Sequence, residues 1–423
     1  MIKLRPYQKQ IVTQGSDLVT RYGFCYLAME VRTGKTLTSL SICQRLKATN
    51  VLFVTKKKAI SSIEDDMQKL QGNFKLLVIN YESLHKVSHE TIYDFLIIDE
   101  AHTIGAFPKQ NKRSKQIKRL IDIHHPRVLL LSGTPTPESY SQMYHQVCGI
   151  YNNPFEYCKN FYQFARNYVD VKKKIINGIP HNDWSHGRED ILKAMKKYTI
   201  SFTQNQAGFK VQTNEQILFV DICGGVTDLM KRLSKDRVIK GDSEVILADT
   251  PVKLMIKSHQ MSSGTIKFES GNSMVLCHKK ATYIMKKFAG KKIAIFYKFK
   301  AELQALKDEF GNSLCETLEE FNTTNKSIAL QIVSGREGIS LRKAEALVYY
   351  NIDFSATSYW QSRDRMTTKD RLYNKIYWIF SKTGIEKQIY KAVVKKKDYT
   401  LSHFKKDLVT LNDDGTADTS QIN

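Results

Sequence analysis

The chain has 423 residues, more than one hydrophobic core usually accommodates, so we expect more than one domain. Hydrophobic residues make up 42% of it and aromatic residues 10%, which excludes a mostly disordered protein. Lysine and arginine outnumber aspartate and glutamate by 65 to 42, a net charge of +23. A polyanion is the natural partner of such a surface, although a basic surface can also serve solubility alone.

Secretion, membrane and zinc signals are not found in this sequence. The first residues, MIKLRPYQKQ, contain no apolar signal core, and no apolar run approaches the roughly 20 residues that cross a bilayer. The seven cysteines form no CxxC pair and no Cys/His spacing typical of zinc, so we expect reduced, mostly buried thiols. We therefore expect a cytoplasmic protein with no membrane partner.

Short apolar segments alternate with helical patterns from residue 24 onward: FCYLAM, VLFVT, KLLVIN, FLIID and RVLLLSG. Near-continuous apolar strands between helices are typical of a parallel sheet covered on both faces. Ligands of such sheets bind at the carboxyl ends of the strands. The sequence therefore predicts an α/β domain over residues 1–150.

The pattern changes after this first domain. Aromatic and basic helical stretches dominate residues 151–275, where we expect a largely helical connecting region. The strand-like segments KKIAIFYKF, SIALQIVSG, ALVYYNID and KIYWIFS predict a second α/β domain over residues 276–400. The polar remainder, residues 401–423, is predicted to be a frayed tail.

A phosphate-binding loop is predicted at RTGKT, which follows an apolar strand and precedes a helical segment. Backbone N–H groups of the loop can surround phosphates, Lys35 can neutralise their charge, and the hydroxyl of Thr36 can ligate Mg²⁺. Met29 replaces the first glycine of the stricter GxxxxGKT pattern, so the loop has to turn differently; a chance GKT is the alternative. The predicted nucleotide-binding residues here are Arg32, Thr33, Gly34, Lys35 and Thr36.

The segment FLIIDEAH complements this loop, because an apolar strand delivers Asp99 and Glu100 to its carboxyl end. Asp99 can hold Mg²⁺ through water, and Glu100 can orient and deprotonate the attacking water. Two adjacent carboxylates after a buried strand are unfavourable unless a cation offsets them. Together with Lys35 they predict a nucleotide-hydrolysing site, beside which SGTP places Ser132 and Thr134 to relay the state of the phosphate.

The order of these motifs resembles that of the superfamily 2 helicases and translocases, DEAH box included, and within them the Swi/Snf-type group. It runs LRPYQ, RTGKT, VINYESL, DEAH, SGTP, IFYKF, SGREGISL and QSRDR, and spans both α/β segments. The chain is most similar to compact phage-encoded DNA helicases that process branched DNA. This resemblance implies an α/β fold of two tandem RecA-like domains, with ATP between them and nucleic acid across their top.

Several site residues follow from the resemblance alone. Gln8 of LRPYQ is implied to hydrogen-bond adenine, with Arg5 or Tyr7 packing beside the base; an exposed residue at a helix start is the alternative for Gln8. Gly335 and Gly338 of SGREG lie in the loop that is implied to approach ATP from the second domain.

Gln361 and Arg365 of QSRDR match the family motif that reaches the γ-phosphate. Arg365 is implied to stabilise the charge that develops in the transition state. The second arginine of the family falls on Thr368, so either Lys369 or Arg371 replaces it or the arginine finger is incomplete.

The nucleic-acid contacts that the resemblance implies follow strands of the two α/β domains. They are Lys56, Lys57, Lys58, Asn80, Tyr81 and Lys298. The three consecutive lysines have a plain alternative, a solvated run of charge. Contacts to phosphates carry no sequence information, so we expect little sequence preference.

These inferences predict an ATP-dependent DNA helicase or translocase that uses ATP and Mg²⁺ on duplex, forked or junction DNA. Replication, recombination or repair, including branch migration and fork processing, would be its setting, in the bacterial host cytoplasm if a phage encodes it. Two alternatives stay open: an RNA helicase, which uses the same ATP site, and a nucleic-acid-binding scaffold with a weakened motor.

Overall fold

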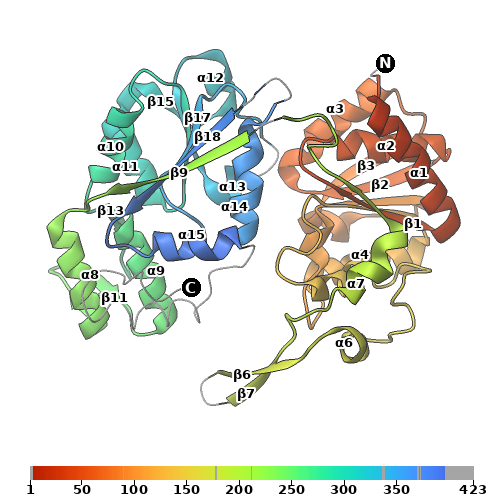
Figure 1. Ribbon diagram of the computed structural model, residues 1–423, viewed down its shortest axis with the longest axis horizontal. Helices are drawn as coiled ribbons and strands as arrows, with labels where there is room; N and C mark the ends of the chain where they lie inside the picture. Colours follow the sequence, from red (N-terminus) through yellow and green to blue (C-terminus); the bar gives the residue numbers. More distant parts are fainter. Residues whose placement is uncertain are drawn as a thin grey trace. The chain divides into compact units, whose positions relative to one another are not determined.

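A computed structural model divides the chain into two compact units, Met1–Phe209 and Lys210–Asn423 (Figure 1). The structure describes residues 3–88, 90–176, 179–210, 212–335, 339–368, 371 and 373–395. Each unit is an α/β domain built on a six-stranded parallel sheet.

The sheet of unit 1 has the strand order β3-β2-β4-β5-β1-β8, and all neighbouring strands are parallel. Its strands are β1 (Phe24–Met29), β2 (Asn50–Thr55), β3 (Lys75–Asn80), β4 (Phe95–Asp99), β5 (Arg127–Leu131) and β8 (Thr199–Phe202). Because the strands are parallel, their carboxyl ends lie along one edge of the sheet. Strand β5 separates β1, which leads into RTGKT, from β4, which ends in the DEAH segment.

Helices cover both faces of this sheet (Figure 1). Successive strand residues face opposite sides: Val51 and Phe53 pack under the first group of helices, whereas Leu52 and Val54 pack under the second. The first group is α1 (Pro6–Tyr22), α2 (Lys35–Arg45) and α3 (Ile60–Leu70), and the second is α4 (Lys112–His124), α5 (Met143–Val147), α6 (Phe161–Tyr168) and α7 (Asp190–Met195). Short 3-10 helices complete the unit: η1 (Lys57–Ala59), η2 (Tyr81–Lys86), η3 (Ala101–Ile104), η4 (Tyr140–Gln142) and η5 (Lys196–Tyr198).

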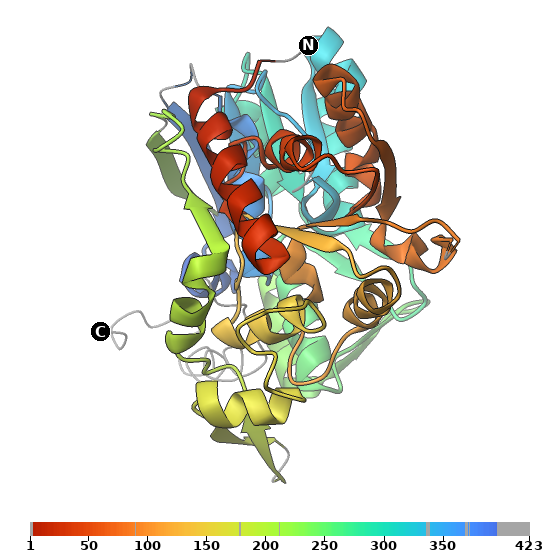
Figure 2. The same ribbon diagram turned by 90° about the vertical axis from the view of Figure 1, so that its right-hand side faces the viewer.

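A separate antiparallel hairpin interrupts the helices of unit 1. It consists of β6 (Lys172–Ile176) and β7 (Ile179–Asp183), and neither strand joins the six-stranded sheet. Figures 1 and 2 both show this hairpin projecting away from the body of unit 1.

Unit 2 repeats the parallel architecture with the strand order β15-β16-β14-β17-β18-β9. Its strands are β9 (Gln212–Val220), β14 (Ile293–Tyr297), β15 (Leu314–Cys315), β16 (Ser327–Gln331), β17 (Ala346–Tyr349) and β18 (Tyr373–Ser381). Two small antiparallel pairs lie outside the sheet: β10 (Val238–Lys240) with β11 (Val245–Leu247), and β12 (Thr265–Lys267) with β13 (Ser273–Val275).

Helices also cover both faces of the second sheet. One face carries α10 (Lys279–Lys287) and α11 (Lys300–Phe310). The other carries α8 (Gly224–Asp236), α9 (Pro251–Ser262), α12 (Leu318–Thr323), α13 (Ile332–Gly335), α14 (Ala356–Arg363) and α15 (Glu386–Val394). Unit 2 also contains two 3-10 helices, η6 (Gly311–Ser313) and η7 (Asp364–Met366).

The predicted fold class, α/β with two tandem RecA-like parallel sheets, is confirmed. Residues 151–275 differ from the separate helical region that we expected: β8 completes the first sheet, β9 joins the second, and the division falls after Phe209. The physical reason is visible in β9, an edge strand whose sequence QTNEQILFV mixes exposed and half-buried positions. Such a strand gives a weaker signal than the continuous apolar run of a central strand.

The cysteines also differ from expectation in one respect. Cys223 and Cys277 of unit 2 form a disulfide, with their Cα atoms 5.8 Å apart. The two residues are 54 positions apart, and no repeated cysteine spacing in the sequence indicates such a pairing. The free cysteines are Cys25, Cys43, Cys148, Cys158 and Cys315.

A buried ion pair joins α10 to α15 in unit 2. The ammonium of Lys280 contacts Oε1 of Glu386, and both side chains are almost completely buried. Ser381 donates a 3.0 Å hydrogen bond to Oε2 of the same carboxylate. Burial raises the pKa of Glu386, and Lys280 and Ser381 oppose that rise.

Two searches of the described ranges gave negative results. None of their helices is long and apolar enough to cross a bilayer. Within the same ranges, His, Cys, Asp and Glu side chains form no group of three or more that could hold a metal ion.

Candidate nucleotide site

The RTGKT loop connects β1 to α2 at the carboxyl edge of the first sheet. Arg32 and Gly34 adopt left-handed backbone conformations, with φ angles of 63° and 84°. The hydroxyl of Thr33 donates a 2.7 Å hydrogen bond to the carbonyl of Glu30 and closes the turn. The chain therefore reverses direction through these residues, which explains how the loop forms although Met29 stands in place of a glycine.

Lys35 is the first residue of α2, and its side chain lies over the loop that precedes it. Its Nζ donates hydrogen bonds to the carbonyls of Met29 at 2.9 Å and Glu30 at 3.4 Å. Gly133 of SGTP lies next to it, because a Cβ at Gly133 would be 3.6 Å from Nζ of Lys35. Thr36 follows in the first turn, where N–H groups lack partners within the helix and favour an anion. The loop, the lysine and the helix start thus face the same place.

The amino-terminal motif LRPYQ contacts this loop directly. The hydroxyl of Tyr7 donates a 3.1 Å hydrogen bond to the carbonyl of Thr33, and Arg5 donates a 2.9 Å bond to the same hydroxyl. Gln8 is only 4% exposed, and its Nε2 lies 3.5 Å from the carbonyl of Gly34. The alternative of an exposed helix-start residue does not hold for Gln8. Its contact with adenine stays a prediction.

The DEAH carboxylates lie at the end of β4, on the same edge of the sheet. The hydroxyl of Thr55 donates a 2.8 Å hydrogen bond to Oδ2 of Asp99, and the hydroxyl of Tyr81 donates to the backbone carbonyl of Asp99. Burial and the negative charge of Glu100 raise the pKa of Asp99 to about 6, whereas the hydrogen bond from Thr55 and the charge of Lys35 lower it. A carboxylate pair in this setting is best stabilised in its charged form by a nearby cation.

His102 connects the DEAH segment to the SGTP loop. Its Nδ1 lies 3.3 Å from Oε2 of Glu100 and 3.0 Å from Oγ of Ser132. Ser132 in turn accepts a 3.1 Å hydrogen bond from the backbone N–H of Thr134. Glu100 itself has a left-handed backbone with a φ of 51°, so the chain turns sharply where the carboxylate is presented.

Three contributors to this site were not singled out from the sequence: Thr55, His102 and Gly133. Thr55 ends β2, the strand next to β4, so its place at a carboxyl end is the signal that could have identified it. The contacts of His102 and Gly133 depend on β5 lying between β1 and β4. The order of strands in a sheet cannot be deduced from the motifs alone, so these two residues were not identified.

The predicted nucleic-acid contacts of unit 1 divide into two groups. Lys57 and Lys58 are exposed directly after β2, as a backbone contact requires. Tyr81 is only 1% exposed, and its ring lies under the guanidinium of Arg113 at 5.2 Å. Its hydroxyl supports the DEAH strand, so the structure gives Tyr81 a structural role in place of the surface contact that we expected. Asn80 is half-buried and donates a 3.3 Å hydrogen bond to Glu82.

Lys298 and Gly335 of unit 2 have structural roles that the sequence did not indicate. The ammonium of Lys298 lies 2.6 Å from a carboxylate oxygen of Asp353 and 4.0 Å from the centre of the Phe354 ring. A Cβ at Gly335 would lie 2.8 Å from the ring of Phe296, so close packing alone requires a glycine there. Lys298 directly follows β14, as predicted, whereas Gly335 ends α13 and so does not lie in the loop that we expected.

The QSRDR residues lie on α14 and η7 of unit 2. Nε of Arg365 donates a 3.0 Å hydrogen bond to the carbonyl of Gln361, a residue that is 4% exposed. Arg371 donates hydrogen bonds to the carbonyls of Ala344 at 2.6 Å and Met366 at 3.4 Å, and burial lowers its pKa. Its guanidinium is thus occupied inside the unit. Two further predicted positions, Gly338 and Lys369, lie outside the described residues.

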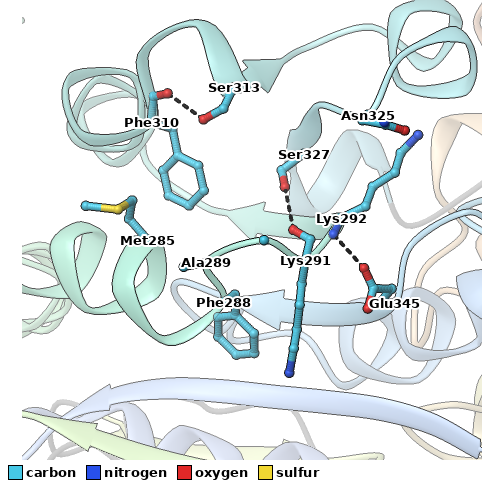
Figure 3. Close-up of a pocket in the computed structure, with 11 residues that line it drawn as sticks. Met285, Phe288, Ala289, Lys291, Lys292, Phe310, Ser313, Asn325, Ser327 and Glu345 are labelled. Atoms are coloured by element: carbon cyan, nitrogen blue, oxygen red, sulfur yellow. Dashed lines mark hydrogen bonds between the residues drawn. The ribbon is translucent and has the colours of Figure 1, made fainter.

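A pocket of about 590 Å³ lies at the opposite, amino-terminal edge of the second sheet (Figure 3). Lys292 and Glu345 precede β14 and β17, and the backbone N–H of Lys292 donates a 2.8 Å hydrogen bond to the carboxylate of Glu345. The ammonium of Lys292 donates to backbone carbonyls, at 2.5 Å to that of Phe321. None of the predicted site residues lines this pocket, so it is separate from the carboxyl edge.

Comparison with known protein families gives two matches, and both fall within residues 1–222. Residues 44–222 match the SNF2-related domain, and residues 1–73 match the type III restriction enzyme, res subunit. Together the two matched ranges cover residues 1–222. The restriction-enzyme match contains LRPYQ and RTGKT, and the SNF2-related match contains DEAH and SGTP.

Solved structures were also compared. The chain is similar to the Sulfolobus solfataricus SWI2/SNF2 ATPase core in complex with dsDNA, at 14% identity and a TM-score of 0.41, over 98% of this chain and 94% of that one. It is also similar to the Sulfolobus solfataricus SWI2/SNF2 ATPase core domain, at 14% identity and a TM-score of 0.43, over 94% of this chain and 89% of that one. No curated protein matches the sequence closely enough to be a relative.

Proposed function

We propose that this protein is an ATP-driven DNA translocase or helicase whose unit 1 binds ATP with Mg²⁺. One observation carries the proposal: loops after β1, β4 and β5 bring Lys35, the Asp99–Glu100 pair and Ser132 together at one edge of the sheet. Carboxyl ends of parallel strands are where ligands of open α/β sheets bind. A phosphate-binding loop with a nearby carboxylate pair suits phosphoryl transfer to water.

The residues at this edge fit a magnesium nucleotide. Gly34 lets the loop pack closely against Gln8, because a Cβ there would lie 2.4 Å from that side chain. The hydroxyl oxygen of Thr134 is buried and has no hydrogen-bond partner among the described residues. Lys35 and the start of α2 favour phosphates, while Thr36 and Asp99 offer the oxygen ligands that Mg²⁺ prefers. When bound, Mg²⁺ would neutralise charge on the phosphates.

Each side chain then has a definable task. Lys35 neutralises the phosphates from its position on the loop. Glu100 orients the attacking water and accepts its proton, and His102 holds the Glu100 carboxylate in place from 3.3 Å. Thr55 holds Asp99 in the orientation that a metal ligand needs.

Unit 2 is proposed to complete the site during turnover. Arg365 would stabilise the charge that develops on the transferred phosphoryl group, and Gln361, whose carbonyl accepts from Arg365, would position it. ATP binding would bring the two units together and hydrolysis would release them, which is how a split site drives movement.

DNA is the proposed track because the chain carries a net charge of +23 and exposes Lys57 and Lys58 after β2. A protein that contacts DNA only through its phosphates can move along it without sequence preference. An RNA helicase is the second candidate, because the same ATP site serves both. Competition among forks, four-way junctions, plain duplex, single strands and RNA for ATPase stimulation decides between them.

The roles of Lys35 and Glu100 are tested with Lys35→Ala and Glu100→Gln, measured as ATP hydrolysis at saturating DNA. Both variants should lose at least about a hundredfold in kcat, because each removes a transition-state contact. Lys69→Ala and Glu64→Gln, exposed changes of the same kinds on α3, are the matched controls and should hydrolyse ATP like the parent. Parental hydrolysis by either site variant would refute the assignment, and a parent that binds DNA without hydrolysis would be a scaffold.

A further inference from the structure

The β6–β7 hairpin, which projects from unit 1 in Figures 1 and 2, has exposed side chains on both of its faces. Ile175 is 77% exposed and Ile179 is 60% exposed. A two-stranded hairpin that packs against nothing is only marginally stable in water. A hairpin that presents isoleucines to solvent therefore suits a partner that covers them.

The charge of the hairpin indicates the chemistry of that partner. Lys172, Lys173 and Lys174 lie on β6, and Asp183 on β7 is the acidic residue among the described hairpin positions. Asp183 is already paired with Lys174 at 2.8 Å. Burial would raise the pKa of Asp183, but hydrogen bonds from Lys174 and Ser185 outweigh it and lower that pKa to about 2. The aspartate thus neutralises Lys174 and leaves the charges of Lys172 and Lys173 for a partner.

The strand register sorts these residues onto two faces. Lys173 pairs with Asn182 and Ile175 pairs with Pro180, so these four share one face. Lys172 lies opposite Asp183 on the other face, which Ile179 shares nearer the turn. Each face therefore carries a lysine near the root of the hairpin and an isoleucine closer to its turn.

The root of the hairpin is firmly anchored in unit 1. Ser141 donates a 2.6 Å hydrogen bond to the carbonyl of Trp184, directly after β7. The ring of Trp184 packs edge-on against Phe161 and Tyr162 of α6, with centroids 5.8 and 5.4 Å away. A β-bridge between Val169 and Gly187 closes the base. Because its base is anchored in this way, the hairpin moves together with unit 1.

Exposed apolar side chains are concentrated in the sequence segment that contains this hairpin. Six of the sixteen exposed large hydrophobic residues of the described chain lie within 29 consecutive positions. They are Tyr151, Tyr157, Tyr162, Val171, Ile175 and Ile179. Exposed aromatic rings beside lysines are typical of surfaces on which nucleic-acid bases stack while phosphates are neutralised.

We propose that the β6–β7 hairpin binds forked DNA, with Lys172 and Lys173 on the phosphates and Ile175 and Ile179 against the base pair at the junction, so that movement separates the strands. A two-stranded β-ribbon fits the major groove, and apolar side chains can unstack neighbouring bases. The inference rests on the proposed function, since movement along DNA supplies the force.

The lysines are tested with the double variant Lys172→Ala/Lys173→Ala of the full chain, by titrating ATPase activity with a forked duplex at several salt concentrations. Half-maximal stimulation should need about five to ten times more DNA, and the salt slope should weaken by about two phosphate contacts, with kcat at saturating DNA unchanged. Lys231→Ala/Lys235→Ala on α8, which also removes two exposed lysines, is the control. An unchanged titration, or an equal loss in the control, would overturn the contact.

The isoleucines are tested with Ile175→Ser/Ile179→Ser, by comparing fork unwinding with ATP hydrolysis in the same reactions. Unwinding should fall at least about tenfold while DNA-stimulated hydrolysis stays at the parental rate, because the change affects bases and not phosphates. Ile92→Ser, which removes an exposed isoleucine elsewhere in unit 1, should behave like the parent. Parental unwinding by the double variant, or a parent that never separates strands, would overturn the strand-separating role.

A direct binding measurement separates this inference from the proposed function. Fluorescence anisotropy of a labelled fork, without ATP, reports the hairpin contact even in a chain that does not hydrolyse ATP. A weaker complex for Lys172→Ala/Lys173→Ala supports the contact whatever the ATPase result. Equal affinity of parent and variant overturns it even when the motor assignment stands.

Discussion

The hydroxyl of Tyr7 donates a 3.1 Å hydrogen bond to the carbonyl of Thr33, which joins the start of α1 to the phosphate loop. Tyr7→Phe removes this bond and keeps the ring, which stacks on Phe202. The KM for ATP should rise about 3- to 10-fold with kcat within about twofold of the parent, because a loop-shaping bond of this kind contributes about 0.5 to 1.5 kcal/mol. Steady-state kinetics check this, with the exposed Tyr373→Phe as control. A fall in kcat at constant KM would contradict it.

Thr55→Val removes the 2.8 Å hydrogen bond to Asp99 with little change in side-chain volume. The variant should need about ten times more Mg²⁺ for half-maximal ATPase activity, because outer partners of a metal ligand tune its affinity. A magnesium titration at saturating ATP measures the shift. Thr49→Val, an exposed change directly before β2, should leave the titration unchanged. An equal shift in both variants would rule out a specific role for Thr55.

Gly34→Ala places a methyl group on a residue with a φ of 84° and 2.4 Å from the side chain of Gln8. A left-handed alanine costs about 1 to 2 kcal/mol, so calorimetry should show the Tm of unit 1 falling by about 2 to 8 °C. ATP binding should weaken at the same time, because the loop must move. Gly225→Ala is the control, since a Cβ there meets nothing within 4 Å. Unchanged Tm and ATP affinity would show that the loop tolerates the strain.

Two variants determine whether Arg365 or Arg371 acts as the arginine finger. Arg365→Ala should bind ATP normally and lose kcat by about 10³-fold, because a transition-state contact is lost. Arg371→Ala should chiefly lower the stability of unit 2, because it leaves the carbonyls of Ala344 and Met366 without their donor. Single-turnover kinetics and thermal unfolding separate these effects. A larger kcat loss in the stable Arg371→Ala protein would transfer the finger role to that residue.

Lys280→Met breaks the buried pair with Glu386, and the free energy of unfolding of unit 2 should fall by about 3 to 5 kcal/mol. Burial already raises the pKa of Glu386, and loss of Lys280 should raise it further. A group with a raised folded-state pKa favours the folded state at low pH, so the deficit should shrink as the pH falls from about 8 to about 5. Denaturant unfolding across that range measures it. A deficit that is constant with pH would show that the carboxylate stays charged.

The sequence predicted the parts of the first sheet that have continuous apolar strands, and with them the residues at the strand ends. The positions of Lys35, Asp99 and Glu100 could be predicted, because Lys35 begins the helix after one apolar strand and the two carboxylates stand at the end of another. The strands β8 and β9 were missed because they are edge strands with exposed positions, and their signal is weak next to the helices of the same segment.

The partners of the site residues were harder to predict than the residues themselves. Tyr81 and Lys298 follow strands as predicted, but their side chains are held by Asp99 and Asp353, which only the folded chain brings near. Likewise the disulfide between Cys223 and Cys277 depends on tertiary proximity across 54 residues. Sequence patterns give the position of a residue along an element and leave its neighbours undetermined.

Gly133 offers a way to block the nucleotide site without dismantling it. A Cβ there would lie at ordinary contact distances, 3.6 Å from the ammonium of Lys35 and from the carbonyl of Met29. The loop therefore tolerates a small side chain, whereas a branched side chain would sterically occlude the space in front of Lys35. If the proposed function holds, Gly133→Val would bind DNA without binding ATP, which would separate DNA binding from movement in one molecule.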